Sequence, residues 1–159
     1  MHDRSSTMTE EVAAIWAFLN ETLERMIAVG NELSTDEIHW SPPSSEGNSI
    51  AVLLAHTTGS IEESILQALA RESVNRDRDA EFVERGTSAE LLAEHWSMVA
   101  ARLEPVFSTL DADQLRGIHV HPRRGEMSGR DVLLSALAHA REHLGQVELN
   151  RDLILASRS

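Results

Sequence analysis

The chain of 159 residues has the length of one domain with a single sizeable core. Its 26 acidic residues outnumber its 14 basic ones, and the formal net charge of −12 argues against a nucleic-acid partner, whose phosphates need basic surfaces. There is no cysteine, which excludes disulfides and thiolate ligands, and no apolar run of about 20 residues that would span a membrane. The first ten residues contain no apolar signal region, so we expect a cytoplasmic protein.

Four stretches place apolar residues at the period of an α-helix, and no long stretch alternates with the period of a strand. Thr9 caps the first expected helix, Asn48 or Ser49 caps the second, and Ser88 caps the third. The expected helices cover about residues 9–33, 48–70, 89–110 and 128–156. The polar connection over residues 71–86 is too long for a tight hairpin between adjacent helices. We therefore predict an all-α four-helix bundle with long crossover connections.

Two histidines, His139 and His143, lie four residues apart on the last predicted helix, at the edge of its core-facing side. Side chains at this spacing are neighbours, so two imidazoles can reach one metal ion. His56, on the second predicted helix, is the best candidate for a third ligand. It begins a polar stripe beside the apolar face of that helix, which continues with Ser60, Glu63 and Gln67. The spacing alone leaves open the alternative of three unrelated histidines, bonded to water or to backbone carbonyls.

Three segments of the sequence carry motifs that occur together in one known family. They are LSTDEIHWSPPSSEGNSIAVLLAH (residues 33–56), NRDRDAEF (75–82) and SGRDVLLSALAHAREHLGQVELNR (128–151). They contain a W-x-P turn, an N-S-I-A…H helix start and an H-x-x-x-H pair followed by G-Q. With these motifs the chain resembles the DinB-like (YfiT/DinB) family of metalloenzymes. We expect one DinB-like domain over residues 9–157, preceded by a disordered tail over residues 1–8.

The resemblance implies an up-down-down-up four-helix bundle, often found as a homodimer. It also implies a divalent metal ion held by His56, His139 and His143. Ligation by nitrogen alone suits zinc, nickel, iron or copper, and manganese if waters complete the shell. Three protein ligands leave coordination positions open, which is typical of a catalytic metal site.

Characterised relatives include isomerases and S-transferases that depend on mycothiol, bacillithiol or similar thiols. The resemblance therefore implies a low-molecular-weight thiol as a cofactor and a small molecule as the substrate. Under this hypothesis Glu63 or Gln146 orients the bound thiol or a bound water, although Glu63 has an alternative role as an exposed or dimer-contacting carboxylate. The rival function is a non-catalytic, metal-stabilised bundle that acts through a protein partner, and a polar cavity above the ligands would argue against it.

The segment HAREH also matches the H-x-x-E-H motif of inverted zincin peptidases. Those enzymes need a carboxylate ligand well downstream of the motif, but only 16 residues follow His143 (159 − 143). Glu142 also lies about 100° round the helix from His143, on its more polar flank. We therefore reject a peptidase.

Three other histidines and a tryptophan also qualify as site residues. His95 on the third predicted helix could be a fourth ligand, although a histidine at the edge of the core is the simpler interpretation. His119 and His121 lie in a connection that could approach the mouth of the site, but we expect a solvated loop there. Trp40 could stack over the site or simply pack against its own turn.

Two further features concern ligands and partners. Arg76 and Arg78 could meet an anionic thiol cofactor, although such charge runs are more often exposed and paired with each other. Leu134, Ala138 and Leu149 form a second apolar strip on the last predicted helix, away from its core face. We expect this strip to contact a second copy of the chain in a homodimer.

Overall fold

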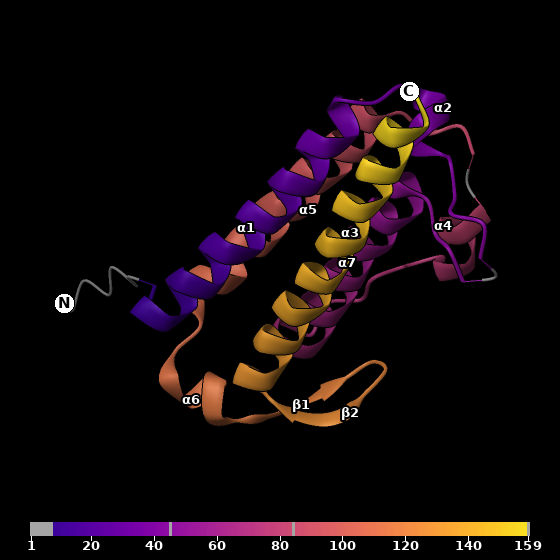
Figure 1. Cartoon of the computed structure of the whole chain (residues 1–159). Coiled ribbons are helices and arrows are strands. Elements are labelled where there is room, and N and C mark those ends of the chain that lie inside the picture. The colour runs from indigo at the N-terminus through magenta and orange to yellow at the C-terminus, as the bar shows by residue number, and fades with distance from the viewer. Residues whose placement is uncertain (1–7, 45, 84, 159) are drawn as a thin grey trace.

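Four long helices make up most of the chain (Figure 1). A computed structural model describes residues 8–44, 46–83 and 85–158. The long helices are α1 (Glu10–Asn31), α3 (Ile50–Ile65), α5 (Ala89–Thr109) and α7 (Gly129–Ser157). The shorter elements are α2 (Thr35–Ile38), the π-helical turn η1 (Leu66–Ala70), α4 (Arg78–Val83), α6 (Ala112–Arg116), β1 (Ile118–His121) and β2 (Gly125–Ser128). The predicted all-α class is confirmed, with the small two-stranded sheet as the exception.

Each long helix begins at a hydroxyl side chain that caps its N-terminus. Each cap accepts a hydrogen bond from the backbone N–H three residues further on, and the four caps are Thr9, Ser49, Ser88 and Ser128. This bond satisfies one of the N–H groups that have no partner within the helix. The helices therefore start where the sequence predicts.

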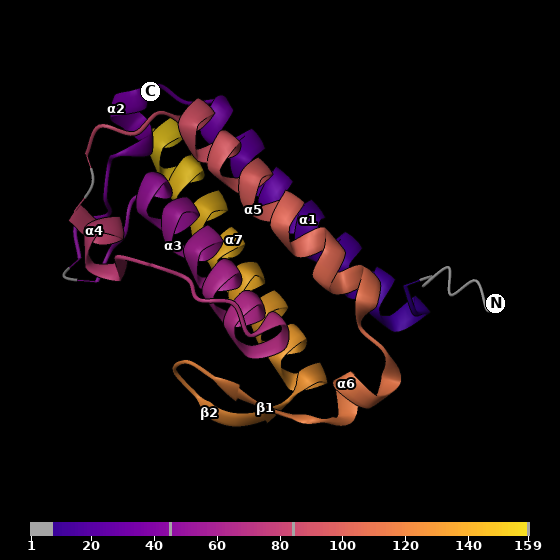
Figure 2. The ribbon, with the colours of Figure 1, turned by 180° about the vertical axis from the view of Figure 1, so that it is seen from behind.

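The four long helices pack side by side in two layers, one of α1 and α7 and the other of α3 and α5 (Figures 1 and 2). Both α5 and α7 contact α1 as well as α3. In Figures 1 and 2, α1 and α7 run in one direction and α3 and α5 run in the opposite direction. Buried apolar side chains from all four helices form one core, for example Met26, Ile61, Phe107 and Val147.

The connection before α7 differs from the sequence-based expectation. β1 and β2 pair as an antiparallel hairpin, with His121 opposite Gly125, where we expect an irregular segment. Gly125 has a φ of +76°, a conformation that favours glycine and allows the tight turn. The long connection after η1 begins where the sequence predicts, because Arg71 adopts a left-handed φ of 57° and ends the helix abruptly.

Two predictions concern the N-terminus and the outer face of α7. The predicted tail lies outside the described residues except for Met8, which is partly buried and packs against the core. Leu134 and Leu149 are 45% and 58% exposed, and Ala138 is exposed as well, so the apolar strip of α7 lies on the surface.

In the part of the chain that the structure describes, no helix is long and apolar enough to cross a membrane.

Candidate metal centre

Three histidines come together between α3 and α7. α3 supplies His56, and α7 supplies His139 and His143 one turn apart. Each histidine offers one ring nitrogen, and these three nitrogens lie within 4.8 Å of one another. The ring centroids of His139 and His143 are 4.3 Å apart, and each lies 5.2 Å from the centroid of His56. The three side chains are therefore placed to hold one metal ion.

His143 has one bonded ring nitrogen and one without a partner. Its Nδ1 lies 2.8 Å from Oε1 of Gln146, which can only accept, so Nδ1 carries the proton of a neutral ring. Its Nε2 is buried and has no hydrogen-bond partner among the described residues. A buried polar atom without a partner costs free energy. A divalent metal ion bound through nitrogen would satisfy this atom, so the histidines fit the predicted metal.

His56 meets His139 at the ring nitrogens that face each other. The two Nε2 atoms lie 3.2 Å apart. On the other edge of the His56 ring, Nδ1 lies 3.2 Å from Nη2 of Arg76 and 3.4 Å from Oε2 of Glu81. A guanidinium only donates and a carboxylate only accepts, so these neighbours favour opposite tautomers of the ring. The tautomer that donates its Nδ1 proton to Glu81 leaves the Nε2 lone pair available to a metal.

Their surroundings keep the two histidines of α7 uncharged at neutral pH. Burial, followed by the nearby His143 and His56, lowers the pKa of His139 from 6.5 to about 4. Burial also lowers the pKa of His143, although the hydrogen bond to Gln146 opposes this effect. Because metal ions bind the neutral imidazole, neither ring has to lose a proton before it can act as a ligand.

An ion cluster that we call the inner triad lies against His56 and consists of Arg76, Glu63 and Glu81. The Arg76 side chain is only 4% exposed and donates two hydrogen bonds of 2.7 Å to Glu81 and one of 3.0 Å to Glu63. Burial alone would raise the pKa of Glu81, but hydrogen bonds from Arg76 and His56 outweigh it and lower the pKa. The pKa of Glu63 is lowered in the same way, against burial, by Arg123 and Arg76. Both carboxylates are therefore ionised at neutral pH.

Gly59 on α3 allows the inner triad to approach the helix. A Cβ atom at this position would lie 2.9 Å from Nε of Arg76 and would overlap Oε1 of Glu81. The absence of a side chain therefore makes room for the Arg76–Glu81 pair next to His56.

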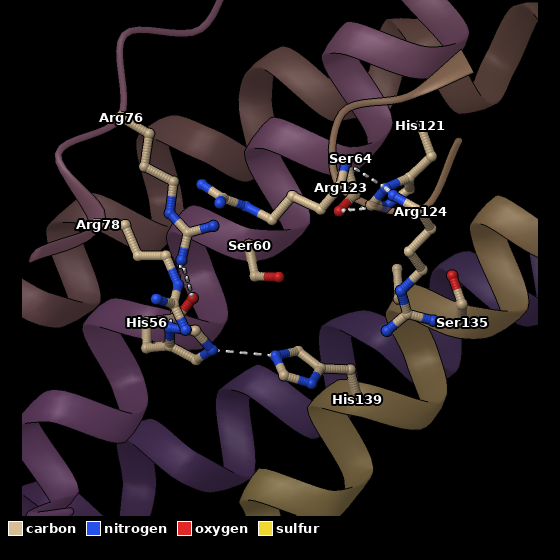
Figure 3. Close-up of a pocket in the computed structure, with 11 residues that line it drawn as sticks. His56, Ser60, Ser64, Arg76, Arg78, His121, Arg123, Arg124, Ser135 and His139 are labelled. Atoms are coloured by element: carbon tan, nitrogen blue, oxygen red, sulfur yellow. Dashed lines mark hydrogen bonds between the residues drawn. The ribbon is translucent and has the colours of Figure 1, made fainter. Parts of the chain in front are cut away.

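A cavity of about 150 Å³ opens beside His56 and His139. Figure 3 shows the two rings turned toward each other from neighbouring helices, with arginine side chains around them. The polar groups of the cavity wall come from Ser60, Ser64, Ser135, His121, Arg76, Arg78, Arg123 and Arg124. A metal ion at the histidines would therefore lie beside a space of the size that suits a small ligand.

The β1–β2 hairpin brings Arg123 and Arg124 to this cavity, and His121 holds the turn in place. Nδ1 of His121, which is 5% exposed, accepts hydrogen bonds from the backbone N–H groups of Arg123 and Arg124, at 3.1 and 3.2 Å. Its Nε2 therefore carries the proton of the neutral ring and donates to Oγ of Ser64 on α3, 3.0 Å away. Glu63 accepts two more hydrogen bonds from the side chain of Arg123. These contacts tie the hairpin to α3 near the histidines.

Comparison with known proteins identifies the family. Residues 19–147, most of the chain, match the DinB superfamily. The chain belongs to the DinB superfamily. It is also similar to a solved structure of a conserved protein from Enterococcus faecalis, with a TM-score of 0.71 and 16% sequence identity over 91% of this chain and 96% of that chain. At this identity the likeness concerns the fold alone, and a comparison with curated proteins finds no match.

Membership in the DinB superfamily confirms the resemblance that the sequence motifs indicate. The two residues expected to orient a bound thiol or water have other contacts. Gln146 bonds to His143, and Glu63 bonds to Arg76 and Arg123. The alternative of an exposed or dimer-contacting Glu63 is wrong, because these ion pairs bury the residue to 7% exposure.

Sequence reasoning missed two residues that shape this DinB site. Glu81 lies within the NRDRDAEF segment that carries part of the resemblance, so a carboxylate near the ligands could be sought there. Arg123 lies in the turn of a hairpin that the sequence does not predict. No signal in the sequence indicates that this arginine reaches Glu63 on α3.

The other sequence candidates lie outside the histidine cluster. His95 is half-buried on α5 and does not belong to the group placed to hold a metal. His119 bonds through its ring to the backbone carbonyl of Gln114 at 2.8 Å. The expectation of a solvated loop is wrong for His121, because that residue is buried against Ser64. Trp40 is 37% exposed and does not line the cavity.

Proposed function

We propose that this DinB protein is a metal-dependent enzyme that activates a low-molecular-weight thiol, either to transfer it to a small electrophile or to isomerise a small substrate. His56, His139 and His143 hold the divalent cation. The observation that carries the proposal is the buried, unpartnered Nε2 of His143, which belongs to a three-histidine cluster that borders a cavity. A cluster that served only the fold would be expected to satisfy such an atom within the protein.

The three histidine ligands limit which metal can bind, and the absence of cysteine limits the source of the thiol. Three neutral imidazoles suit zinc, nickel, iron or manganese and leave coordination positions for other ligands. When bound, such a cation supplies Lewis acidity, which favours the thiolate form of a thiol or lowers the pKa of a water. The chain contains no cysteine, so the thiol has to come from a small molecule.

The residues around the histidines orient the ligands and the substrate. Oε1 of Gln146 accepts a hydrogen bond from the Nδ1–H of His143, which turns Nε2 of that ring toward the cluster. Glu81 takes the corresponding position at Nδ1 of His56. Ser60 places a hydroxyl in the wall of the cavity, where it can accept or donate a hydrogen bond to a bound molecule.

The proposal includes the architecture that the sequence predicts. The opposite directions of α1 and α7 relative to α3 and α5 support an up-down-down-up bundle as a single domain over residues 9–157. The exposed strip of Leu134, Ala138 and Leu149 supports a homodimer. Sedimentation equilibrium tests the dimer, and a monomer whose mass does not change with concentration would contradict it.

A non-catalytic, metal-stabilised bundle is the alternative function. The cavity bordered by His56 and His139 supports catalysis, since a structural metal site is normally closed by protein ligands. Thermal melting with and without a chelator separates the two functions. A structural metal gives a large drop in melting temperature on chelation, whereas the proposed enzyme loses its activity with a smaller drop.

The first test is the metal content of the untagged protein and of the His143→Ala variant, measured by elemental mass spectrometry. We expect close to one metal ion per chain in the wild type and little in the variant. His95→Ala is the matched control and keeps its metal, because His95 lies outside the cluster. Thiol-dependent transfer by the loaded wild type, lost in His143→Ala, supports the enzyme. A wild type without metal, even after incubation with zinc, nickel and manganese, overturns the proposal.

A further inference from the structure

The cavity beside the histidines concentrates positive charge in an acidic protein. The chain carries a net charge of −12 and has no lysine, yet four of its 14 arginines line this one cavity. Arg76 is neutralised within the inner triad, and Arg123 pairs with Glu63. Arg78 and Arg124 differ from them, because neither has a carboxylate within ion-pair distance among the residues that the structure describes.

These two arginines approach the cavity from different segments. Arg78 is the first residue of α4, and Arg124 lies in the turn between β1 and β2. In Figure 3, Arg78 lies beside His56 and Arg124 lies beside Ser135, on opposite sides of the cavity. Both segments are anchored to the rest of the site. The Phe82 ring of α4 packs 5.1 Å from the His56 ring of α3 and also lies against the guanidinium of Arg78, and the backbone N–H of Arg124 bonds to His121.

We propose that this cavity binds a small dicarboxylate, with one carboxylate on Arg78 and the other on Arg124. A guanidinium binds a carboxylate through two parallel hydrogen bonds, so each arginine offers one complete site. Two separated cations favour two separated anionic groups over one compact anion such as phosphate. The volume of about 150 Å³ limits the ligand to a small molecule.

The dicarboxylate would lie next to the three histidines. Its role as a reactant there rests on the proposed function, whereas its binding does not. The two carboxylates belong either to the electrophilic substrate or to the thiol itself, and these sources share the same recognition chemistry. Succinate represents a dicarboxylate without a thiol, and mercaptosuccinate carries the same two carboxylates together with a thiol.

Isothermal titration calorimetry of the full chain after chelation tests this site. The probes are succinate and glutarate, with propionate and inorganic phosphate as ligands that offer a single anionic group. We expect a dicarboxylate to bind more tightly than either control, and Arg78→Gln and Arg124→Gln each to weaken its binding about tenfold. Arg116→Gln is the matched control and keeps the wild-type affinity, because Arg116 pairs with Asp113 outside the cavity. Both cavity arginines are exposed, and thermal melting verifies that the variants fold.

Three results would overturn the dicarboxylate site: no binding of either dicarboxylate to the folded wild type, unchanged affinity in both cavity variants, or phosphate that binds as tightly as the dicarboxylates. Because these titrations contain no metal, such a failure leaves the proposed enzyme intact. Conversely, a wild type that takes up no metal overturns the enzyme and not the dicarboxylate site.

A second titration, with metal-loaded protein, identifies which molecule carries the two carboxylates. Tighter binding of mercaptosuccinate than of succinate assigns the carboxylates to the thiol, and equal binding assigns them to the electrophile. Both results support the site.

Discussion

Two ion clusters of identical composition start from adjacent residues of α3. The inner triad contains Arg76, Glu63 and Glu81, and a second cluster, the outer triad, contains Arg102, Glu62 and Glu72. Adjacent residues of a helix point about 100° apart, so the two glutamates of α3 reach different surroundings. The arginine side chain is 4% exposed in the inner triad and 46% exposed in the outer one.

The difference in burial decides what each triad can do. In the outer triad, water and salt screen the charges, so the ion pairs contribute little to stability and do little to fix the positions of neighbouring side chains. In the inner triad, the charges are desolvated and have to remain paired, which fixes the side chains and the His56 ring that they contact. The same three residue types thus make a surface contact in one place and a support for the metal site in the other.

Removal of the central arginine should give the largest contrast. Arg76→Met leaves Glu81, whose side chain is only 13% exposed, without its partner, so we expect the free energy of unfolding to fall by about 3 kcal/mol. Arg102→Met removes the equivalent residue of the outer triad and should cost about 1 kcal/mol or less. Urea denaturation measures both values, and equal losses in the two variants would contradict the importance of burial.

Each triad has one glutamate that lies outside α3, and these two residues provide the next comparison. Glu81→Gln keeps the size of the side chain but removes its negative charge, which weakens the interaction with Nδ1–H of His56. We therefore expect the affinity for zinc to fall about 10–100-fold. Glu72→Gln changes the corresponding residue of the outer triad, and the affinity should not change. Competition titrations against a zinc chelator measure both, and an unchanged affinity in Glu81→Gln would show that His56 needs no support from the triad.

A pair of glycines sharpens the comparison with a smaller effect. Gly59→Ala introduces a Cβ atom that displaces the Arg76–Glu81 pair, so the zinc affinity should fall, though less than in Glu81→Gln. Gly145→Ala on α7 is the control, because nothing lies within 4 Å of its added Cβ atom. It should stabilise the protein by up to about 1 kcal/mol through helix propensity and leave the zinc affinity unchanged. Equal zinc affinities in the two variants would exclude a role for Gly59 in placing the triad.

The helices and their histidines could be predicted from the sequence because local geometry determines them. Capping residues mark where the helices start, and a spacing of four residues brings His139 and His143 together on any α-helix. The position of His56 follows from the side of α3 that has to face the core.

The remainder of the site depends on segments whose course the sequence does not determine. Glu81 reaches His56 only because the chain turns back toward α3 after Arg71. The β1–β2 hairpin lacks the usual strand pattern, since Ile118 and Val120 are 66% and 69% exposed and only His121 is buried. Its position depends on contacts with α3 that are far apart in the sequence, such as the bond between His121 and Ser64.

The pH dependence of stability separates the histidines from the inner triad. In the metal-free protein, the pKa of His139 is lowered from 6.5 to about 4, mainly by burial. Between these values the unfolded chain binds a proton that the folded chain does not, so stability falls as the pH falls from 6.5 to about 4.

The carboxylates of the inner triad act in a lower pH range. The pKa of Glu81 lies below its ordinary 4.5, because hydrogen bonds from Arg76 and His56 outweigh burial, so the stability that it contributes is lost only as the pH falls below that value. His139→Gln should therefore reduce the loss of stability between pH 6.5 and 4.5, whereas Glu81→Gln should alter it mainly below pH 4.5. Thermal melting in the presence of a chelator measures both ranges. If His139→Gln follows the wild type throughout, burial does not hold this imidazole neutral, and the metal would have to displace a proton from it.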